Sequence, residues 1–579
     1  MTEAQILPLR VRMTEAQILP LRVRMTEAVM ARKEQPEMPR DGKKTKLKTE
    51  RERPFEKEKL IEAGTMKARV WWTVGCVALM AASAQGQSKS GCEALKQLTI
   101  PGVKMEVSRA EILPAGAAPK AGPWSYEGPL PERCMVEGEL NKRIGVDGKP
   151  YGIRFAFALP SDWNRDFLMQ GGGGANGTVG APIGATAAGD KPALTRGFAV
   201  ASNDTGHEGA VFDFGFMKDE QAFLDFAYEA NHQVADVAKQ FIAAYYGKPA
   251  AHSYFVGCST GGREGMIFTE RYPDVFDGVV SGAPARRTGY SNIASGPWAA
   301  VAYNQAAPKD ADGKPITAQT LSDDDRKLVI GALLKRCDAK DGVADGMIFD
   351  PLGCDFDPAQ IQCKGAKDAS CLTAVQVKAI KTAFAGPKNL HGDRVYPAYL
   401  YDTGVAVKAP IPGMLAIGVG PGIFGPVTKA MEIDVDQMSK AAEQPLVDAL
   451  STNLTSFSGH GGKQIFYHGD SDPWFSALDT LGYYQAMAAD NGGLEKVSEW
   501  SRFFFVPGMG HCGGGQAALD QFDMLGAIVD WVEKGSAPQS VEASGKAFPG
   551  RTRPLCAYPK HAQYKGSGDT EKAENFECR

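Results

Sequence analysis

The stretch YFVGCSTG, residues 254–261, joins an apolar run to the pattern G-x-S-x-G around Ser259. The pattern alone is weak in a chain that contains 66 glycines. Here, however, it follows a β-forming run and precedes residues 262–272, which have the apolar spacing of a helix. A serine on a sharp turn between a strand and a helix is typical of the nucleophile elbow of α/β-hydrolases. The stretch therefore predicts that Ser259 is a nucleophile at the end of a strand.

Strand and helix patterns alternate on both sides of this turn, which indicates a mostly parallel sheet. Between residues 286 and 450 the chain is instead rich in Pro, Gly, Asp and Cys and has few strand signals. An insertion of this kind commonly covers the carboxyl edge of the sheet, where ligands bind. We therefore predict an α/β-hydrolase fold formed by residues 85–285 and 451–579, with a lid domain at 286–450. The expected strands are 151–159, 167–169, 198–201, 253–257, 278–281, 464–468 and 502–506, and the expected helices are 220–246, 262–272 and 516–534.

The first 84 residues have the features of processing sequence. Residues 1–12 recur word for word as residues 13–24, and two copies are too few for a stacked structural repeat. A basic segment at Met66, a short apolar stretch and Ala82-Ser83-Ala84 together are typical of a secretory signal. We expect 1–65 to be a non-native or disordered extension and 66–84 to be a signal peptide, which makes the mature chain secreted or periplasmic. The apolar stretch is too short for a stable membrane span, which needs roughly 20 residues.

Charge and cysteine content narrow the class of protein. The chain has 64 Lys+Arg against 68 Asp+Glu, so no global basic surface points to a nucleic-acid partner. Of its 11 cysteines, Cys76 lies in the proposed signal, and the remaining ten form an even set. An even set fits a disulfide framework in an exported protein, with buried free thiols as the alternative.

A serine nucleophile needs a base that takes its proton and an acid that orients the base. Of the eight histidines, only His511 follows a late strand through a glycine-containing turn, whereas His561 lies in a polar tail. Asp470 and Asp472 both follow the preceding strand and both qualify as the acid by position. Asp470 or Asp479 could equally be a turn or helix-capping residue.

Two cysteines flank the proposed reacting residues. Cys258 immediately precedes Ser259, and Cys512 immediately follows His511. If the serine and the histidine meet in an active site, the two sulfur atoms come close as well, and a bond between them would hold the base beside the nucleophile. Two unrelated cysteines at these positions are the less favoured reading.

Together these motifs resemble the tannase and feruloyl esterase family. The segments GCSTGGREGM (257–266), HGDSDPWFSALDT (468–480), VPGMGHC (506–512) and TRPLC (552–556) are especially similar to its MHETase-like branch. The resemblance implies a serine carboxylesterase whose substrates are small aromatic esters of the hydroxycinnamic, gallic or terephthalic monoester type. The implied triad is Ser259, Asp472 and His511, with an oxyanion hole formed by the backbone N–H groups of Gly174 and Thr260.

The resemblance also implies a structural calcium ion in the lid and five disulfide bonds. Three carboxylates on a glycine-broken loop can converge on a hard cation, although a solvated acidic turn is the alternative. The implied calcium ligands are the carboxylates of Asp338, Asp341 and Asp345 and the carbonyls of Val343 and Met347. The implied disulfide pairs are Cys92 with Cys134, Cys258 with Cys512, Cys337 with Cys354, Cys363 with Cys371, and Cys556 with Cys578.

One departure from that branch concerns the substrate. Its members hold a free carboxylate with a lid arginine in a Trp-rich segment, but residues 411–424 here contain neither Arg nor Trp. A lysine such as Lys408 does not reproduce the bidentate geometry of an arginine. His468, Trp474 and Phe475 are candidates for an apolar wall that binds the substrate, or for core residues. Hydrolysis of terephthalate monoesters, a general lipase and a catalytically lapsed binding protein remain alternatives, and the sequence does not predict the oligomeric state.

Overall fold

The computed structural model describes residues 89–118, 126–406, 414–415, 423–424 and 429–579. The proposed extension and signal peptide, Lys408 and most of residues 411–424 lie outside the described residues.

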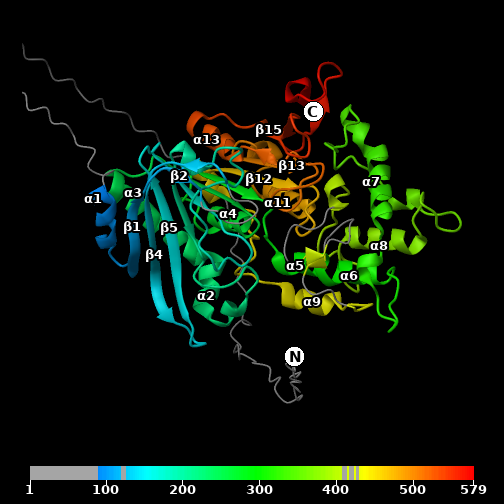
Figure 1. Cartoon of the computed structure of the whole chain (residues 1–579), viewed down its shortest axis with the longest axis horizontal. Coiled ribbons are helices and arrows are strands. Elements are labelled where there is room, and N and C mark those ends of the chain that lie inside the picture. Colours follow the sequence, from blue (N-terminus) through cyan, green and yellow to red (C-terminus); the bar gives the residue numbers. More distant parts are fainter. Residues whose placement is uncertain (1–88, 119–125, 407–413, 416–422, 425–428) are drawn as a thin grey trace, which may run out of the picture. The chain divides into compact units, whose positions relative to one another are not determined.

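The centre of the described chain is a nine-stranded sheet with the order β1-β4-β5-β7-β6-β8-β9-β12-β13 (Figure 1). The β1–β4, β4–β5 and β5–β7 pairs are antiparallel, and every pair from β7–β6 to β12–β13 is parallel. The prediction of an α/β-hydrolase fold with a mostly parallel sheet is confirmed. The strands are β1 (Met105–Leu113), β4 (Arg133–Ile144), β5 (Pro150–Pro160), β6 (Asp166–Gln170), β7 (Ala199–Asn203), β8 (His252–Cys258), β9 (Gly278–Gly282), β12 (Lys463–Gly469) and β13 (Ser501–Val506).

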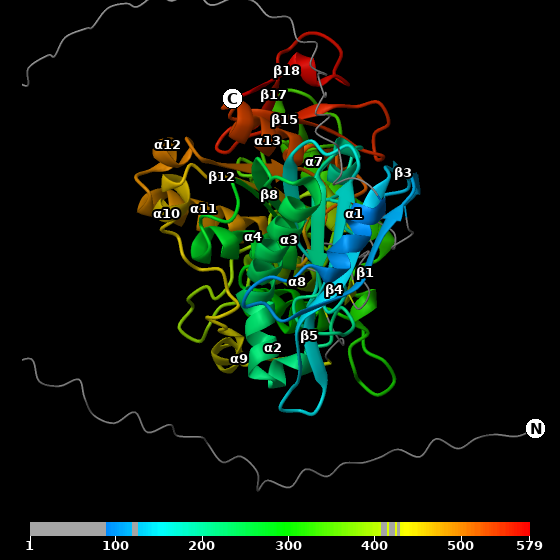
Figure 2. The ribbon, with the colours of Figure 1, turned by 90° about the vertical axis from the view of Figure 1, so that its left-hand side faces the viewer.

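Alternate residues of the central strands face two separate hydrophobic cores. In β8, Phe255 belongs to one core cluster, while Tyr254 and Val256 belong to the other, as the period of a strand requires. The first core takes side chains from α3, α4 and α11, and the second takes them from α13. Figure 2 shows α3 and α4 in front of the sheet. These helices are α3 (Ala230–Tyr246), α4 (Thr260–Arg271), α11 (Ala477–Asp490) and α13 (Met524–Lys534).

The segment after β9 has a hydrophobic core of its own, built from α6, α7 and α8. Two of these helices begin with capping boxes, at Ser322 for α7 and at Thr373 for α8. Both caps satisfy backbone donors that the helix leaves unpaired. In Figure 1 the helices α5 to α9 gather beyond one end of the sheet. They are α5 (Thr288–Ile293), α6 (Ala299–Asn304), α7 (Asp323–Cys337), α8 (Ala374–Ala385) and α9 (Val435–Ala442).

Smaller elements complete the described chain. Helices α1 (Lys89–Ala94), α2 (Glu220–Leu224), α10 (Thr455–Gly459) and α12 (Leu494–Val497) are short. Outside the main sheet the strands are β2 (Gly116–Ala117), β3 (Pro129–Leu130), β10 (Met414–Leu415), β11 (Ile423–Phe424), β14 (Gln521–Phe522), β15 (Ser540–Ser544), β16 (Arg553–Cys556), β17 (Ala562–Tyr564) and β18 (Phe576–Cys578).

Two of the expected helices differ from those in the structure. The helix expected at 220–246 is divided by a π-helical turn at Asp225–Glu229. The helix expected at 516–534 begins only at Met524, because the Asp523 side chain accepts a hydrogen bond from the backbone N–H of Gly526 at 2.8 Å and caps the helix there. The two residues before this cap, Gln521 and Phe522, form β14 instead.

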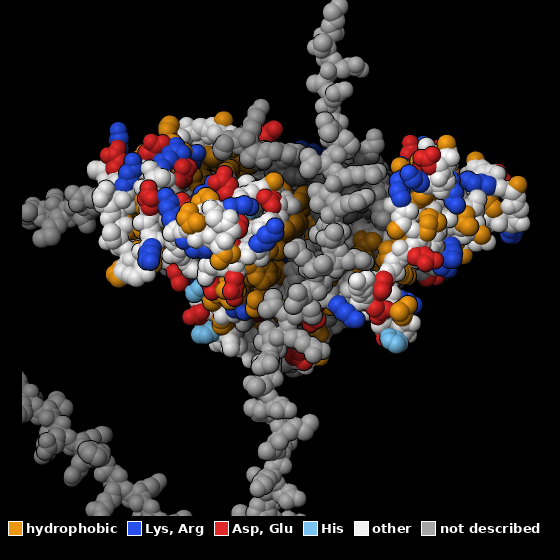
Figure 3. All heavy atoms as spheres, turned by 90° about the horizontal axis from the view of Figure 1, so that it is seen from below, with side chains coloured by type: hydrophobic (Ala, Val, Ile, Leu, Met, Phe, Trp, Pro, Cys, Tyr) orange, Lys and Arg blue, Asp and Glu red, His pale blue; other side chains and the backbone are white. Residues whose placement is uncertain are grey.

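The structure contains five disulfide bonds, and they join the same pairs that the family resemblance implies. Disulfides at this density are typical of proteins that fold in an oxidising compartment. No helix among the described residues is both long enough and apolar enough to cross a membrane. On the face drawn in Figure 3, basic and acidic side chains are interspersed.

Candidate active site

Ser259 lies at the turn between β8 and α4, where its φ of +63° places it in the left-handed region of backbone space. The turn is possible because Gly257 and Gly261, two positions to either side of Ser259, have no side chains. A Cβ at Gly257 would lie 2.5 Å from the carbonyl carbon of Gly261, and a Cβ at Gly261 would lie 2.8 Å from the carbonyl oxygen of Gly172. This strained serine on a strand-to-helix turn is the arrangement of a nucleophile elbow.

Asp472 and His511 come from loops that follow neighbouring strands, β12 and β13. The strands are parallel and pair from Gln464–Ser501 to Gly469–Val506, so their carboxyl ends meet at one edge of the sheet. The Nδ1 atom of His511 lies 2.7 Å from Oδ2 of Asp472. The other carboxylate oxygen accepts the backbone N–H groups of Trp474 and Phe475, at 2.9 and 3.0 Å. The carboxylate is therefore fixed on one side by the backbone and contacts the imidazole on the other.

The other two aspartates considered from the sequence have different surroundings. Asp470 is buried, and neither of its carboxylate oxygens has a hydrogen-bond partner among the described residues. Asp479 forms ion pairs with Arg286 and Arg287. Of the three, only Asp472 is hydrogen-bonded to His511 within the described structure.

The charge on Asp472 is stabilised by two histidines. Burial opposes ionisation of this carboxyl group, but His511 and His468 more than offset that effect and hold its pKa well below the usual value. The His468 side chain has no exposed surface; its Nε2 lies 3.3 Å from Asp472 Oδ2, and its Nδ1 lies 2.8 Å from the Thr480 hydroxyl. His468 thus lies behind the carboxylate and does not line the cavity beside Ser259.

A disulfide bond between Cys258 and Cys512 connects the serine turn to the histidine loop, with 5.9 Å between the two Cα atoms. Each cysteine is the chain neighbour of a proposed reacting residue. The Sγ atom of Cys512 lies 3.7 Å from Nε2 of His511, the ring nitrogen opposite the one that contacts Asp472. The bond therefore links the turn that carries Ser259 to the loop that carries His511, and His511 is in turn hydrogen-bonded to Asp472.

Gly174 and Thr260, the two residues expected in an oxyanion hole, are in direct contact. The Thr260 hydroxyl donates a hydrogen bond to the carbonyl oxygen of Gly174. Thr260 is the first residue of α4, so its backbone N–H is one that the helix leaves without an intrahelical partner. Gly174 has a φ of +60°, and a Cβ there would lie 2.4 Å from Val211 Cγ1, so the position requires glycine.

A cavity of about 300 Å³ opens beside Ser259. Trp474 and Phe475 lie on its wall, and both of their rings also contact His511, with centroid distances of 5.5 and 5.2 Å. No motif marked the rest of the apolar lining, because these side chains come from several separate segments of the chain that meet at the cavity only in the folded protein. The other apolar residues of the lining are Phe212, Phe214, Met217, Phe226, Ala285 and Val447.

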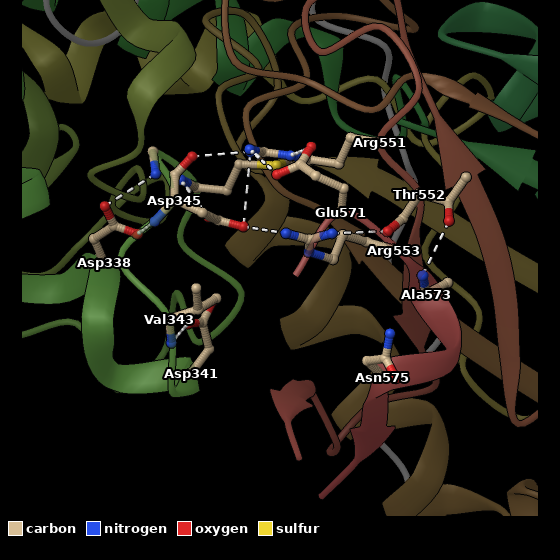
Figure 4. A network of polar contacts seen from close by, with 12 residues as sticks. Asp338, Asp341, Val343, Asp345, Arg551, Thr552, Arg553, Glu571, Ala573 and Asn575 are labelled. Atoms are coloured by element: carbon tan, nitrogen blue, oxygen red, sulfur yellow. Dashed lines mark hydrogen bonds and ion pairs between the residues drawn. The ribbon is translucent and has the colours of Figure 1, made fainter. Parts of the chain in front are cut away.

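The acidic loop of the segment after β9 lies against the C-terminal part of the chain (Figure 4). Asp338 accepts the backbone N–H groups of Asp345 and Gly346, each at 3.0 Å. Asp345 forms ion pairs with Arg551 and Arg553. The Oδ2 atom of Asp341 is buried without a hydrogen-bond partner among the described residues, and burial, together with the nearby Asp345, raises the pKa of Asp341 to about 7. This buried, unpaired oxygen fits a cation ligand.

A second group of possible metal ligands lies at the opposite, amino-terminal end of the parallel strands. His252 Nδ1 is 3.5 Å from Asp166 Oδ1 and 3.6 Å from Glu533 Oε1. These three side chains are close enough together to hold a metal ion, and nothing in the structure specifies which ion.

Comparison with known proteins places the chain among esterases. The family model for tannase and feruloyl esterase matches residues 134–416 and 427–579. The mono(2-hydroxyethyl) terephthalate hydrolase of Piscinibacter sakaiensis is 38% identical over 561 residues, covering 85% of this chain and 92% of that protein. A probable feruloyl esterase B-1 of Neosartorya fischeri is 30% identical, and the match covers 72% of this chain and 82% of that protein.

Solved structures show the same relationship. The crystal structure of feruloyl esterase B from Aspergillus oryzae aligns with a TM-score of 0.68 at 26% sequence identity, covering 85% of this chain and 100% of that chain. The family model spans both parts of the sheet and the segment inserted between them. The chain belongs to the tannase and feruloyl esterase family and is a carboxylic ester hydrolase.

Proposed function

We propose that the protein hydrolyses esters of aromatic carboxylic acids, with Ser259 as the nucleophile, His511 as the base and Asp472 as the acid that orients the base. One observation carries this proposal. The 2.7 Å contact between His511 and Asp472 is tied by the Cys258–Cys512 disulfide to the turn that carries Ser259. This is the set of groups that acyl transfer through a serine requires.

In this mechanism the Ser259 hydroxyl attacks the ester carbonyl while His511 takes its proton. The tetrahedral oxyanion then collapses, the carbon–oxygen bond to the alcohol breaks, and His511 gives its proton to the departing alcohol. Water attacks the acyl-enzyme by the same route and releases the acid. Asp472 stabilises the imidazolium form of His511, and the N–H groups of Gly174 and Thr260 would stabilise the oxyanion.

The aromatic lining of the cavity supports an aromatic acyl group as the substrate. Trp474, Phe475 and Phe226 offer ring faces and edges to a planar ligand. Two relatives are named as a probable feruloyl esterase and a mono(2-hydroxyethyl) terephthalate hydrolase, and these names favour the same class of substrate, an aromatic ester.

Terephthalate monoesters are the second candidate substrate, because of the 38% identity with the Piscinibacter enzyme. No arginine occurs between Arg394 and Arg502, however, so the clamp expected for a free carboxylate is absent from this part of the sequence. Arg263 lines the cavity, but its guanidinium already donates to the carbonyl oxygens of Phe226, Ala227 and Val447. The proposal therefore favours a neutral aromatic acyl group.

We also propose that residues 286–450 form a lid on the hydrolase domain of 85–285 and 451–579, and that the lid holds a structural Ca²⁺. Asp338, Asp341 and Asp345 would supply carboxylates, and Val343 and Met347 would supply carbonyls. The buried, unpaired Asp341 oxygen supports this assignment. The ion would neutralise the clustered charge of the loop and takes no part in ester hydrolysis.

Five disulfides support export of the chain. We propose that residues 66–84 are a signal peptide, that residues 1–65 are not part of the mature protein, and that the enzyme is secreted or periplasmic.

Replacing Ser259→Ala should lower kcat for ester hydrolysis by about 10⁴-fold or more, since triad members act as a unit. The exposed Ser456→Ala variant is the control and should retain full activity. A fluorophosphonate probe should label the wild-type enzyme and not the Ser259→Ala variant. Full activity of Ser259→Ala would refute the mechanism, and an unlabelled, inactive wild type would favour a lapsed binding protein.

A kinetic panel of methyl ferulate, methyl gallate, mono(2-hydroxyethyl) terephthalate and esters of short and long aliphatic acids tests the substrate class. We expect kcat/KM for the best neutral aromatic ester to exceed that for the terephthalate monoester by about tenfold. A charge-assisted hydrogen bond is worth about 1.5 to 3 kcal/mol, and about 1.4 kcal/mol corresponds to a factor of ten. A higher kcat/KM for the terephthalate monoester, or for a long-chain ester, would contradict this proposal.

Removal of Ca²⁺ with EGTA should lower the Tm by several degrees, and added Ca²⁺ should restore it, because a ligand that binds only the folded state stabilises it. The Asp341→Asn variant should have the same lowered Tm as the EGTA-treated wild type, and its Tm should not respond to added Ca²⁺. The control variant is Asp355→Asn. Asp355 is an exposed lid residue whose carboxylate pairs with Arg336 and Lys340. A Tm that is insensitive to chelation would exclude the site.

Export can be measured on the protein recovered from outside the cytoplasm. Its intact mass should correspond to a chain that begins at Gln85, and thiol titration under denaturing conditions should find no free cysteine. A mass that includes residues before Met66 would show that the upstream extension is retained.

A further inference from the structure

One segment of the inserted lid, residues 396–404, lies against the loop that carries Asp472; this segment is named the lid strap here. The Tyr399 hydroxyl donates to the carbonyl oxygen of Trp474 at 2.9 Å. The Ser476 hydroxyl donates to the carbonyl oxygen of Ala398 at 2.5 Å. The lid strap is therefore bonded to the chain immediately after Asp472.

Asp402, in the lid strap, bonds to both loops that supply the proposed acid and base. Its side chain has no exposed surface. A single oxygen, Oδ2, accepts hydrogen bonds from the Ser471 hydroxyl and from the backbone N–H of Gly508, both at 2.6 Å. Ser471 is the chain neighbour of Asp472, and Gly508 precedes His511 in the loop after β13. The carboxylate thus joins the acid loop to the histidine loop through one atom.

Gly404 makes a second, independent contact with the same two loops. Its backbone N–H donates to the Ser471 hydroxyl at 2.8 Å. A Cβ on this residue would lie 2.3 Å from the carbonyl oxygen of Gly508 and 2.7 Å from the Cβ of Ser471. The lid strap therefore enters between the two loops so closely that a methyl group has no room.

We infer that Asp402 and Gly404 are positioning residues that set the distance between Asp472 and His511. This inference rests on the proposed triad and adds a role for the lid, which then completes the acid–base pair as well as covering the substrate. The two loops also touch directly, through the backbone hydrogen bond from Ser471 to Met509 at 3.0 Å. The carboxylate of Asp402 adds a second connection between the same two loops.

The effect on the reaction follows from the geometry. Catalytic groups must be held close to their productive arrangement, and a displacement of about 1 Å can cost about 100-fold in rate. No residue of the lid strap lines the cavity beside Ser259. Loss of the Asp402 contacts should therefore lower kcat and leave KM nearly unchanged.

The test compares kcat and KM for one aromatic ester among Asp402→Ala, Asp402→Asn and Gly404→Ala. We expect Asp402→Ala and Gly404→Ala to lower kcat by about 100-fold with KM within about threefold. Asp402→Asn should recover most of the loss, because its amide oxygen can still accept both hydrogen bonds. The control is Asp325→Asn, another buried lid carboxylate, which bonds to Lys367, Ser322 and Gln376 far along the chain from both loops.

Three results would overturn the inference: a folded Asp402→Ala enzyme with wild-type kcat, a loss confined to KM, or an Asp402→Asn variant as slow as Asp402→Ala. If Asp402→Ala does not fold, Ser471→Ala removes the hydrogen bond to Asp402, together with the one from Gly404, and carries the same expectation. The Ser259→Ala variant separates the two proposals. Its inactivity together with normal lid-strap variants refutes only the positioning role, whereas its full activity refutes the triad itself.

Discussion

Parallel pairing of the strands from β7 to β13 is the constraint on which the site depends, because it brings the carboxyl ends of β8, β12 and β13 to one edge of the sheet. Each of these ends carries one residue of the proposed triad. A one-residue slip in register would turn every side chain of the slipped strand to the other face, and the two buried cores oppose such a slip. Burial on both faces of the sheet therefore fixes the positions of the three strand ends relative to one another.

Several further interactions restrict the conformations of the serine turn and of the loops that follow β12 and β13. Backbone N–H groups fix one oxygen of Asp472, His468 supports the other, and a disulfide bond holds the histidine loop to the serine turn. The inserted segment adds its own contacts through the lid strap. Polar groups in this region are mostly buried, so each unsatisfied partner would cost on the order of 1 to 3 kcal/mol.

The central strands, the serine turn and the disulfide pairs could be expected before the structure was known, because they depend on local patterns or on a family resemblance. The antiparallel strands β1 and β4 were not predicted, and the start of α13 was misplaced because the cap at Asp523 was not recognised. Contacts between distant segments were the hardest to foresee. His468 was a candidate for the substrate wall and lies behind Asp472 instead, while Phe226 and Asp402 reach the site only through tertiary packing.

The disulfide beside Ser259 and His511 also has a consequence for the timing of activity. Thiols stay reduced in the cytosol of most cells, so the covalent link between the two loops forms only where the surroundings are oxidising. A newly made chain therefore carries the side chains of the proposed triad before it carries the bond that joins the Ser259 turn to the His511 loop. If the chain is exported as proposed, the turn that carries Ser259 and the loop that carries His511 become covalently joined only after the chain has left the compartment in which it was made.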